Sequence, residues 1–134
     1  MDEVSHSGGC LCGAVRYRAA GAPTGTSICH CTQCRRQTGA PFAAFASFPA
    51  ERVALLAGQP AVYRATPGVV REFCPACGST LFWRRDGDGK IDVFLGSLDD
   101  PAAMPPPAAQ LWIAHRLPWL PSLPGAVKPP APEG

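Results

Sequence analysis

The sequence predicts a single, mainly β domain with one short helical turn. Its 134 residues fall within the usual size of one domain. Apolar and polar residues alternate in short runs, which is the period-two pattern of strands with one buried face. Turn-forming residues separate these runs, since the chain contains 14 glycines and 16 prolines.

The alternation is clearest in residues 14–19, where Val15 and Tyr17 alternate with two arginines. The other expected strands are short apolar or aromatic runs, at residues 26–29, 41–48, 53–56, 61–64, 69–73, 80–84, 90–95 and 110–114. The sequence Asp-Gly-Asp-Gly at residues 86–89 predicts a hairpin, because Asp-Gly supplies the positive φ angles of a tight turn.

The helical turn is expected at residues 32–37, with Thr32 as its N-cap and Gly39 as its terminator. Residues 97–100 are expected to form a capped turn. The predicted domain covers residues 1–120. Residues 121–134 are rich in proline and have little to bury, so we expect an extended or disordered tail there.

Seven cysteines fall into three groups, and no cysteine lies outside them. The groups are a C-x-C pair (Cys10, Cys12), a C-H-C-x-x-C triplet (Cys29, Cys31, Cys34) and a C-P-x-C pair (Cys74, Cys77). Thiols at such spacing can share one metal ion, and zinc takes four ligands in a tetrahedron. Seven thiolates therefore predict one closed four-sulfur site and one three-sulfur site with an open position, the arrangement of catalytic zinc.

Disulfides are the first alternative to metal ligation. An odd number of cysteines cannot all pair within one chain, and the acidic, polar start resembles no secretory signal. We therefore expect reduced thiols in a cytoplasmic protein. A redox thiol pair or an iron–sulfur cluster are the remaining alternatives.

Spacing alone leaves two ways of combining the groups. The last two cysteines of the triplet with the C-P-x-C pair would form a ribbon-type site, but residues 35–73 put 39 residues between them. Such ribbons usually have about 15–20. Joining the two pairs instead keeps the triplet together on one ion, which we slightly favour. His30 points away from the sulfurs in an extended segment and is expected to be a packing residue.

Charge and hydropathy limit the kinds of partner that this protein can have. The formal net charge is +2; two zinc ions with seven thiolates would add 4 − 7 = −3, giving about −1. Basic doublets occur only at Arg35-Arg36 and Arg84-Arg85. This balance argues against nucleic acid as a partner. The apolar runs are far shorter than the ~20 residues of a membrane span, so no membrane association is expected.

Several stretches resemble the glutathione-dependent formaldehyde-activating enzyme family, also called the centromere protein V domain family. They are residues 8–17, 29–42, 73–81 and 96–101, and Leu111-Trp-Ile followed by Trp119. The resemblance extends over about residues 6–120 and implies an Mss4-like (β-tent) fold. It also implies a structural zinc on the two pairs, Cys10, Cys12, Cys74 and Cys77, and a second, open zinc on Cys29, Cys31 and Cys34.

The resemblance further implies a zinc-dependent carbon–sulfur lyase that acts on the adduct of glutathione, or a similar thiol, with a small aldehyde. S-hydroxymethylglutathione, formed from formaldehyde, is the example. Arg35, Arg36 and Gln37 follow the triplet and are candidates to bind glutathione's carboxylates. The resemblance leads us to expect a histidine just before the late Trp-Ile strand, but this chain has Gln110 there. The alternative function is a non-catalytic zinc-binding module for protein or nucleic acid.

Overall fold

The computed structural model describes residues 4–127, and in them the chain is mainly β with one α-helix. A three-stranded antiparallel sheet has the order β1-β2-β5. An eight-stranded sheet has the order β11-β10-β3-β4-β9-β8-β7-β6. The expected fold class is confirmed: two open sheets, one short helix, and two cysteine groups that fit a zinc-stapled domain.

The strands of the smaller sheet are β1 (Ser5–Gly9), β2 (Arg16–Ala20) and β5 (Val53–Ala57). The larger sheet contains β3 (Gly25–Cys29), β4 (Ala43–Pro49), β6 (Ala61–Tyr63), β7 (Val69–Phe73), β8 (Thr80–Arg85), β9 (Lys90–Phe94), β10 (Ala109–Leu111) and β11 (Ala126–Val127). The helices are α1 (Thr32–Thr38) and the short 3-10 turns Ala50–Arg52, Leu95–Ser97, Pro101–Ala103 and Ile113–His115.

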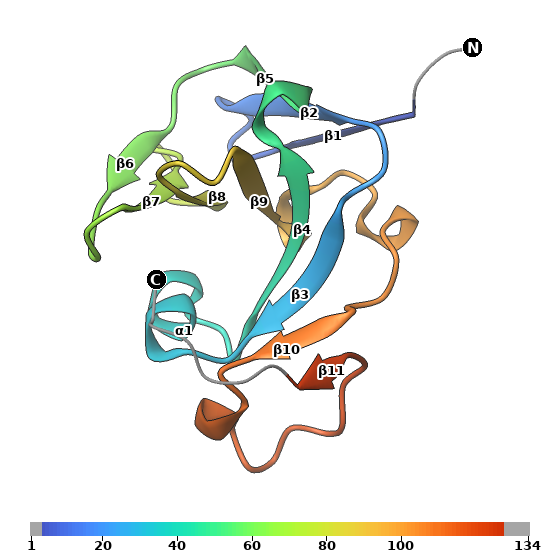
Figure 1. Ribbon diagram of the computed structural model, residues 1–134. Coiled ribbons are helices and arrows are strands. Elements are labelled where there is room, and N and C mark those ends of the chain that lie inside the picture. Colours follow the sequence, from blue (N-terminus) through green and yellow to red (C-terminus); the bar gives the residue numbers. More distant parts are fainter. Residues whose placement is uncertain (1–3, 128–134) are drawn as a thin grey trace.

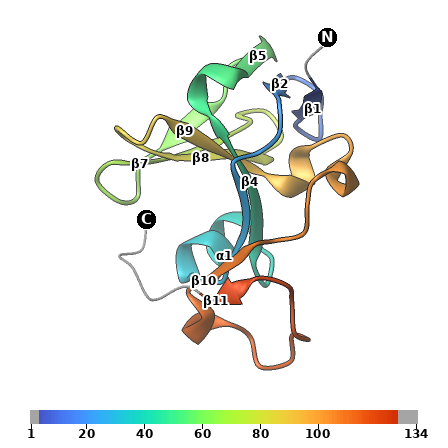
Figure 2. The ribbon, with the colours of Figure 1, turned by 45° about the vertical axis from the view of Figure 1, so that its right-hand side comes forward.

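The long strand β4 connects two parts of the molecule. Figure 1 shows β1, β2 and β5 at its upper end, and α1, β3 and β10 at its lower end. The turned view in Figure 2 keeps α1 beside β10 and β11 at the lower end. The order of the larger sheet agrees, since β4 pairs with β3 on one side and with β9 on the other.

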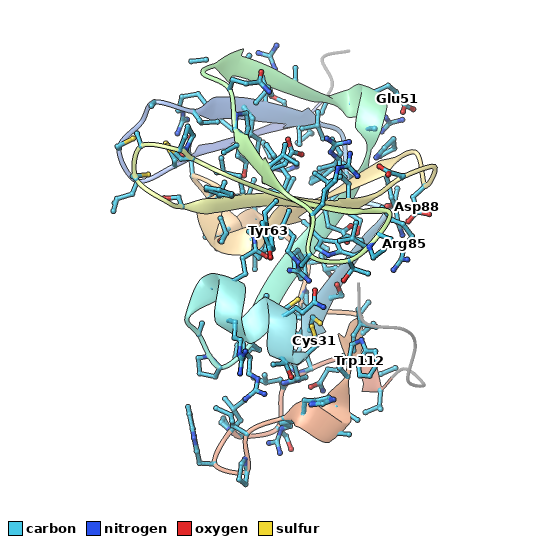
Figure 3. The ribbon with its side chains drawn as sticks, turned by 90° about the vertical axis from the view of Figure 1, so that its left-hand side faces the viewer. Cys31, Glu51, Tyr63, Arg85, Asp88 and Trp112 are labelled. Carbon is cyan, nitrogen blue, oxygen red and sulfur yellow. The ribbon has the colours of Figure 1, made fainter. Side chains whose placement is uncertain are left out.

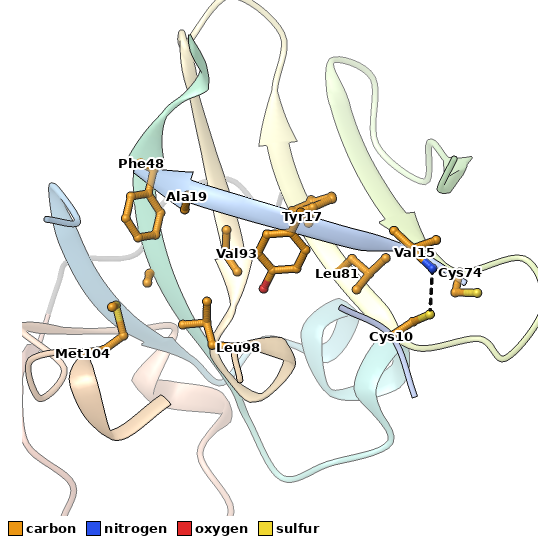
Figure 4. Packing of buried hydrophobic residues seen from close by; sticks show 12 residues of the cluster. Cys10, Val15, Tyr17, Ala19, Phe48, Cys74, Leu81, Val93, Leu98 and Met104 are labelled. Carbon is orange, nitrogen blue, oxygen red and sulfur yellow. Dashed lines mark hydrogen bonds between the residues drawn. The ribbon is translucent and has the colours of Figure 1, made fainter. Parts of the chain in front are cut away.

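The main core lies where the smaller sheet packs on the larger one (Figure 4). Tyr17 of β2 is fully buried, and its hydroxyl lies 2.6 Å from the Ser97 hydroxyl. Its ring meets that of Phe82 edge to face, with the centroids 4.9 Å apart. Val15 is buried as well, while Arg18 is exposed. The alternation expected in this segment is therefore confirmed.

Gly58, at the end of β5, lies against the backbone of the loop before β2. Its φ is +74°, and a Cβ there would overlap the carbonyl oxygen of Ala14. Gly68 has a similar φ of +81°, but a Cβ there would meet nothing within 4 Å. A residue with a Cβ would be strained at both positions, but only at Gly58 would it also clash with a neighbouring backbone atom.

Replacing Gly58 by alanine is therefore expected to lower the free energy of unfolding by at least about 2 kcal/mol, since left-handed strain and overpacking add. Gly68→Ala is the matched control, with an expected loss of about 1 kcal/mol from strain alone. Urea unfolding of both variants at equal metal content measures the difference. Equal losses would show that the approach to Ala14 is not a tight contact.

Local structure differs from the sequence expectation at the start of α1 and at the end of the last expected strand. The N-cap of α1 is Cys31, whose sulfur accepts from the Cys34 N–H, and not Thr32; the expected terminator Gly39 is confirmed, with φ 68°. The last expected strand, 110–114, ends at Leu111 because Trp112 adopts a left-handed backbone, φ 58° and ψ 44°. Strands β1 and β11 were not expected, because their short sequences carry little strand pattern.

The C-terminal segment is described as far as residue 127. The carbonyl oxygens of Leu123 and Gly125 accept from the Gln110 side chain at 2.9 and 3.5 Å. Ala126–Val127 pairs in parallel with β10. Residues 128–134 lie outside the described residues, so the extended or disordered tail stays a prediction.

No helix in the described part is long and apolar enough to cross a membrane.

Candidate metal centres

The two cysteine pairs meet in one four-sulfur group, which we call the closed group (Cys10, Cys12, Cys74 and Cys77). Their ligand atoms all lie within 4.8 Å of one another. The Cys12 sulfur lies 3.6 Å from that of Cys10 and 3.8 Å from that of Cys74. The C-x-C pair comes from a turn, in which the Gly13 N–H donates to the Cys10 carbonyl at 3.1 Å, and not from an extended segment.

The closed group fits tetrahedral zinc. A Zn–S bond of 2.3 Å places the sulfurs about 3.8 Å apart, close to the two distances above. Backbone N–H groups point at the sulfurs, from Val15 to Cys10 at 3.2 Å (Figure 4) and from Ala76 to Cys74 at 3.4 Å. The Val15 N–H also lowers the pKa of Cys10. Such donors favour thiolates, which are the form that binds metal.

The C-P-x-C pair forms the expected knuckle between β7 and β8. The Gly78 N–H donates to the Cys74 carbonyl at 2.8 Å, and Gly78 has the positive φ, 80°, that this turn requires. The Ser79 hydroxyl lies 3.2 Å from the Cys77 sulfur, and this contact is the main reason why the pKa of Cys77 falls to about 5. The knuckle therefore also stabilises thiolates.

The triplet (Cys29, Cys31, Cys34) forms a separate group whose sulfurs also lie within 4.8 Å of one another. Cys29 ends β3, and Cys34 lies in the first turn of α1. Cys31 caps this helix at its start (Figure 3). The Cys34 N–H donates to the Cys31 sulfur at 3.3 Å. The thiols of Cys29 and Cys34 hydrogen-bond to that sulfur as well, and with Cys29 as the largest cause the pKa of Cys31 falls to about 2. The pKa values of Cys29 and Cys34 rise instead, so without a metal the triplet favours one thiolate held by two thiols. The three sulfurs are therefore also close enough together to bind one zinc ion.

The triplet is buried, whereas the closed group reaches the surface. The three thiols are 6%, 1% and 3% exposed, while Cys12 is exposed and Cys77 half-buried. Aromatic rings enclose the triplet: Phe45 and Phe94 are in contact, with centroids 4.6 Å apart, and Trp83 and Trp112 pack against the same cluster. In residues 4–127 the group holds three ligand residues and no fourth.

His30, between two of the thiols, is fully buried and lies outside both metal groups. Its Nε2 lies 3.0 Å from Oε1 of Gln110, and its ring packs near Phe42 with the centroids 6.0 Å apart. This agrees with the expected packing role. Gln110, the residue at the position where a histidine was expected, thus links the triplet loop to the C-terminal segment.

The three residues after Cys34 point to different places. Arg35 and Arg36 line a hollow of about 510 Å³ on one side of α1. Gln37 lines a separate groove of about 700 Å³, which runs from α1 past Thr38 to Cys10 of the closed group. The structure therefore does not gather these three side chains into one carboxylate site.

Sequence reasoning missed Arg71, a buried arginine of β7. Its guanidinium contacts the Cys34 sulfur at 3.9 Å and donates to Gln37 Oε1 at 2.6 Å. The available signal was a charged residue within an apolar strand pattern at 69–73, since charges are rarely buried without a partner.

The chain is similar to known proteins in both sequence and structure. A sequence model of the family described as glutathione-dependent formaldehyde-activating enzyme matches residues 5–115. An uncharacterized lyase of Schizosaccharomyces pombe is 32% identical over 92 residues, which is 69% of this chain and 66% of that protein. The chain thus spans just under two thirds of this relative's length. A crystal structure of a Rhodobacter sphaeroides protein has the same fold, with a TM-score of 0.56, 23% identity, and coverage of 69% of this chain and 87% of that one.

Proposed function

This chain belongs to the glutathione-dependent formaldehyde-activating enzyme family, and from that membership we propose that it is a cytoplasmic, zinc-dependent carbon–sulfur lyase. The proposed reaction joins glutathione, or a similar thiol, to a small aldehyde such as formaldehyde. The observation that carries the proposal is the buried triplet, three thiols at metal-ligand distance with no fourth ligand residue among residues 4–127. The closed group would hold a structural zinc.

The proposed reaction needs little covalent chemistry from the protein. A carbon–sulfur bond forms between the thiol and the aldehyde carbon, and the thiol proton passes to the carbonyl oxygen. Zinc on the triplet would keep the substrate sulfur as a thiolate, the nucleophilic form. Since the addition is intrinsically easy, most of the gain would come from holding two reactants together.

The residues around the triplet suit this task. The rings of Phe45, Phe94, Trp83 and Trp112 exclude water from one side of the thiols. The groove of about 700 Å³ beside α1 is not lined by the triplet thiols themselves, but it borders their cluster through Ala43 and Phe94. Its volume falls within the usual size of small-molecule sites. Thr38 and Ser79 line it and offer hydroxyl groups for hydrogen bonds to a peptide-like thiol. Glutathione is thus the substrate class that we propose for this groove.

Exchange NMR tests the proposal directly. Zinc-loaded protein is added to glutathione and formaldehyde at equilibrium, and the exchange rate between free and adduct signals is measured. We expect faster exchange than in buffer. The control thiol is 2-mercaptoethanol, which lacks the peptide that would fill the groove and should gain less. A rate equal to that in buffer for both thiols would contradict the proposal and favour a non-catalytic zinc module.

A further inference from the structure

One side of the triplet faces a buried cation held by two glutamines. Arg71 is 3% exposed, and its Nη1 lies 3.9 Å from the Cys34 sulfur. Nη1 donates to Gln37 Oε1 at 2.6 Å, and Nη2 donates to Gln33 Oε1 at 3.3 Å. Gln33 and Gln37 are one turn apart on α1, so they grip the guanidinium from the same face of the helix. Gln33 is held in turn by Thr66, at 3.2 Å.

The two glutamines that orient this cation are themselves neutral. Glu72, the next residue of β7, is also buried, but its carboxylate accepts from Arg84 Nε at 2.8 Å. Successive side chains of a strand point to opposite faces, which separates Glu72 from its neighbour. Nη1 of Arg71 lies 3.9 Å from the Cys34 sulfur, so its positive charge is placed beside the triplet.

A buried metal centre of this composition needs such a cation. A divalent ion with three thiolates carries a net charge of −1, and a fourth thiolate makes it −2. Burying net charge is costly unless an opposite charge compensates it. At the closed group, water can reach the exposed Cys12. The triplet is almost fully buried, so compensation there must come from the protein.

We propose that Arg71 is the counter-cation of the three-cysteine site, held in place by Gln33 and Gln37, and that it selects an anionic thiolate over a neutral molecule as the fourth ligand. This inference rests on the proposed metal binding at the triplet. Arg71 acts through the metal and its sulfurs, so it is a positioning residue. It also gives Gln37 a different task from the carboxylate binding expected from the sequence, because its amide oxygen is already engaged.

Cobalt-loaded protein tests the inference without an activity assay. Thiolate-to-cobalt absorption reports both sites, and competition with a chelator gives their affinities. The variants are Arg71→Met, which removes the charge, and Arg71→Lys, which keeps it. Arg36→Met is the matched control, because it removes the same charge from an exposed position on α1. The fourth ligand is probed with 2-mercaptoethanol and with imidazole, a neutral ligand.

For Arg71→Met we expect about 10- to 100-fold weaker cobalt binding at the triplet, the usual effect of losing a partner of metal ligands. Its preference for 2-mercaptoethanol over imidazole should fall by about tenfold. Arg71→Lys should keep most of that preference, and Arg36→Met should match the wild type in both measurements. If Arg71→Met does not fold, Gln37→Met replaces it, with a smaller expected loss in the same direction.

Equal affinities and equal ligand preference in the Arg71 and Arg36 variants would overturn the inference. That result would leave the proposed function intact as long as the wild type accelerates adduct exchange. Conversely, a wild type that binds cobalt at the triplet and prefers thiolates, but accelerates nothing, would support Arg71's role and remove the enzymatic proposal. The two failures are therefore distinguishable.

Discussion

Replacing Cys74 by serine is expected to unfold the protein. Cys74 is fully buried, and it belongs both to the closed group and to the main core. The group joins the turn after β1 to the knuckle after β7, so it cross-links segments far apart in the chain. A structural zinc contributes about 10–16 kcal/mol in small peptides, whereas a whole domain is stable by about 5–15 kcal/mol. Loss of this ion therefore removes most or all of the stability.

Circular dichroism and thermal melting measure this effect, together with zinc content. The Cys74→Ser variant should show no cooperative melting transition, and excess chelator should produce the same state in the wild type. Cys31→Ser is the matched control, since Cys31 is 1% exposed and makes the same side-chain change at the other group. A Cys74→Ser variant that melts within a few degrees of the wild type would show that the closed group does not hold a structural metal.

Cys31→Ser is itself expected to abolish acceleration of adduct exchange while leaving the fold in place. The triplet lies within residues 29–34, so a metal there cross-links very little chain and contributes less to folding than the closed group. Cys31 is the thiol whose pKa falls to about 2, mainly through hydrogen bonding from Cys29, and it also caps α1. Serine keeps the cap but is a poor zinc ligand.

The variant should retain zinc at the closed group, lose it at the triplet, and show the exchange rate of buffer. Metal analysis and exchange NMR on the same sample provide both readouts. A serine variant with the wild-type exchange rate and reduced zinc content would show that catalysis does not depend on a metal at the triplet. One with full zinc and no exchange would show that the ligand set differs from the one proposed.

Local patterns were enough to predict several parts of this protein. The alternation around Tyr17 predicts β2, and Asp-Gly-Asp-Gly predicts the hairpin between β8 and β9, because neighbouring residues alone specify these geometries. The turn that contains Cys74 and Gly78 is likewise specified by neighbouring residues. The pairing of cysteine groups needed more: spacing left two arrangements open, and only the approach of the turn after β1 to the knuckle brings the two pairs together.

The order of residues along the chain already specifies seven thiols in three clusters, a mainly β chain, and turns at glycine and proline. Which thiols meet, which group is buried, and the contacts of Arg71 with Cys34 and of Glu72 with Arg84 are visible only in the folded chain. These features differ in how far apart in the sequence the interacting residues lie. Turns and strand periodicity depend on adjacent residues, whereas charge compensation and burial depend on segments that only folding brings into contact.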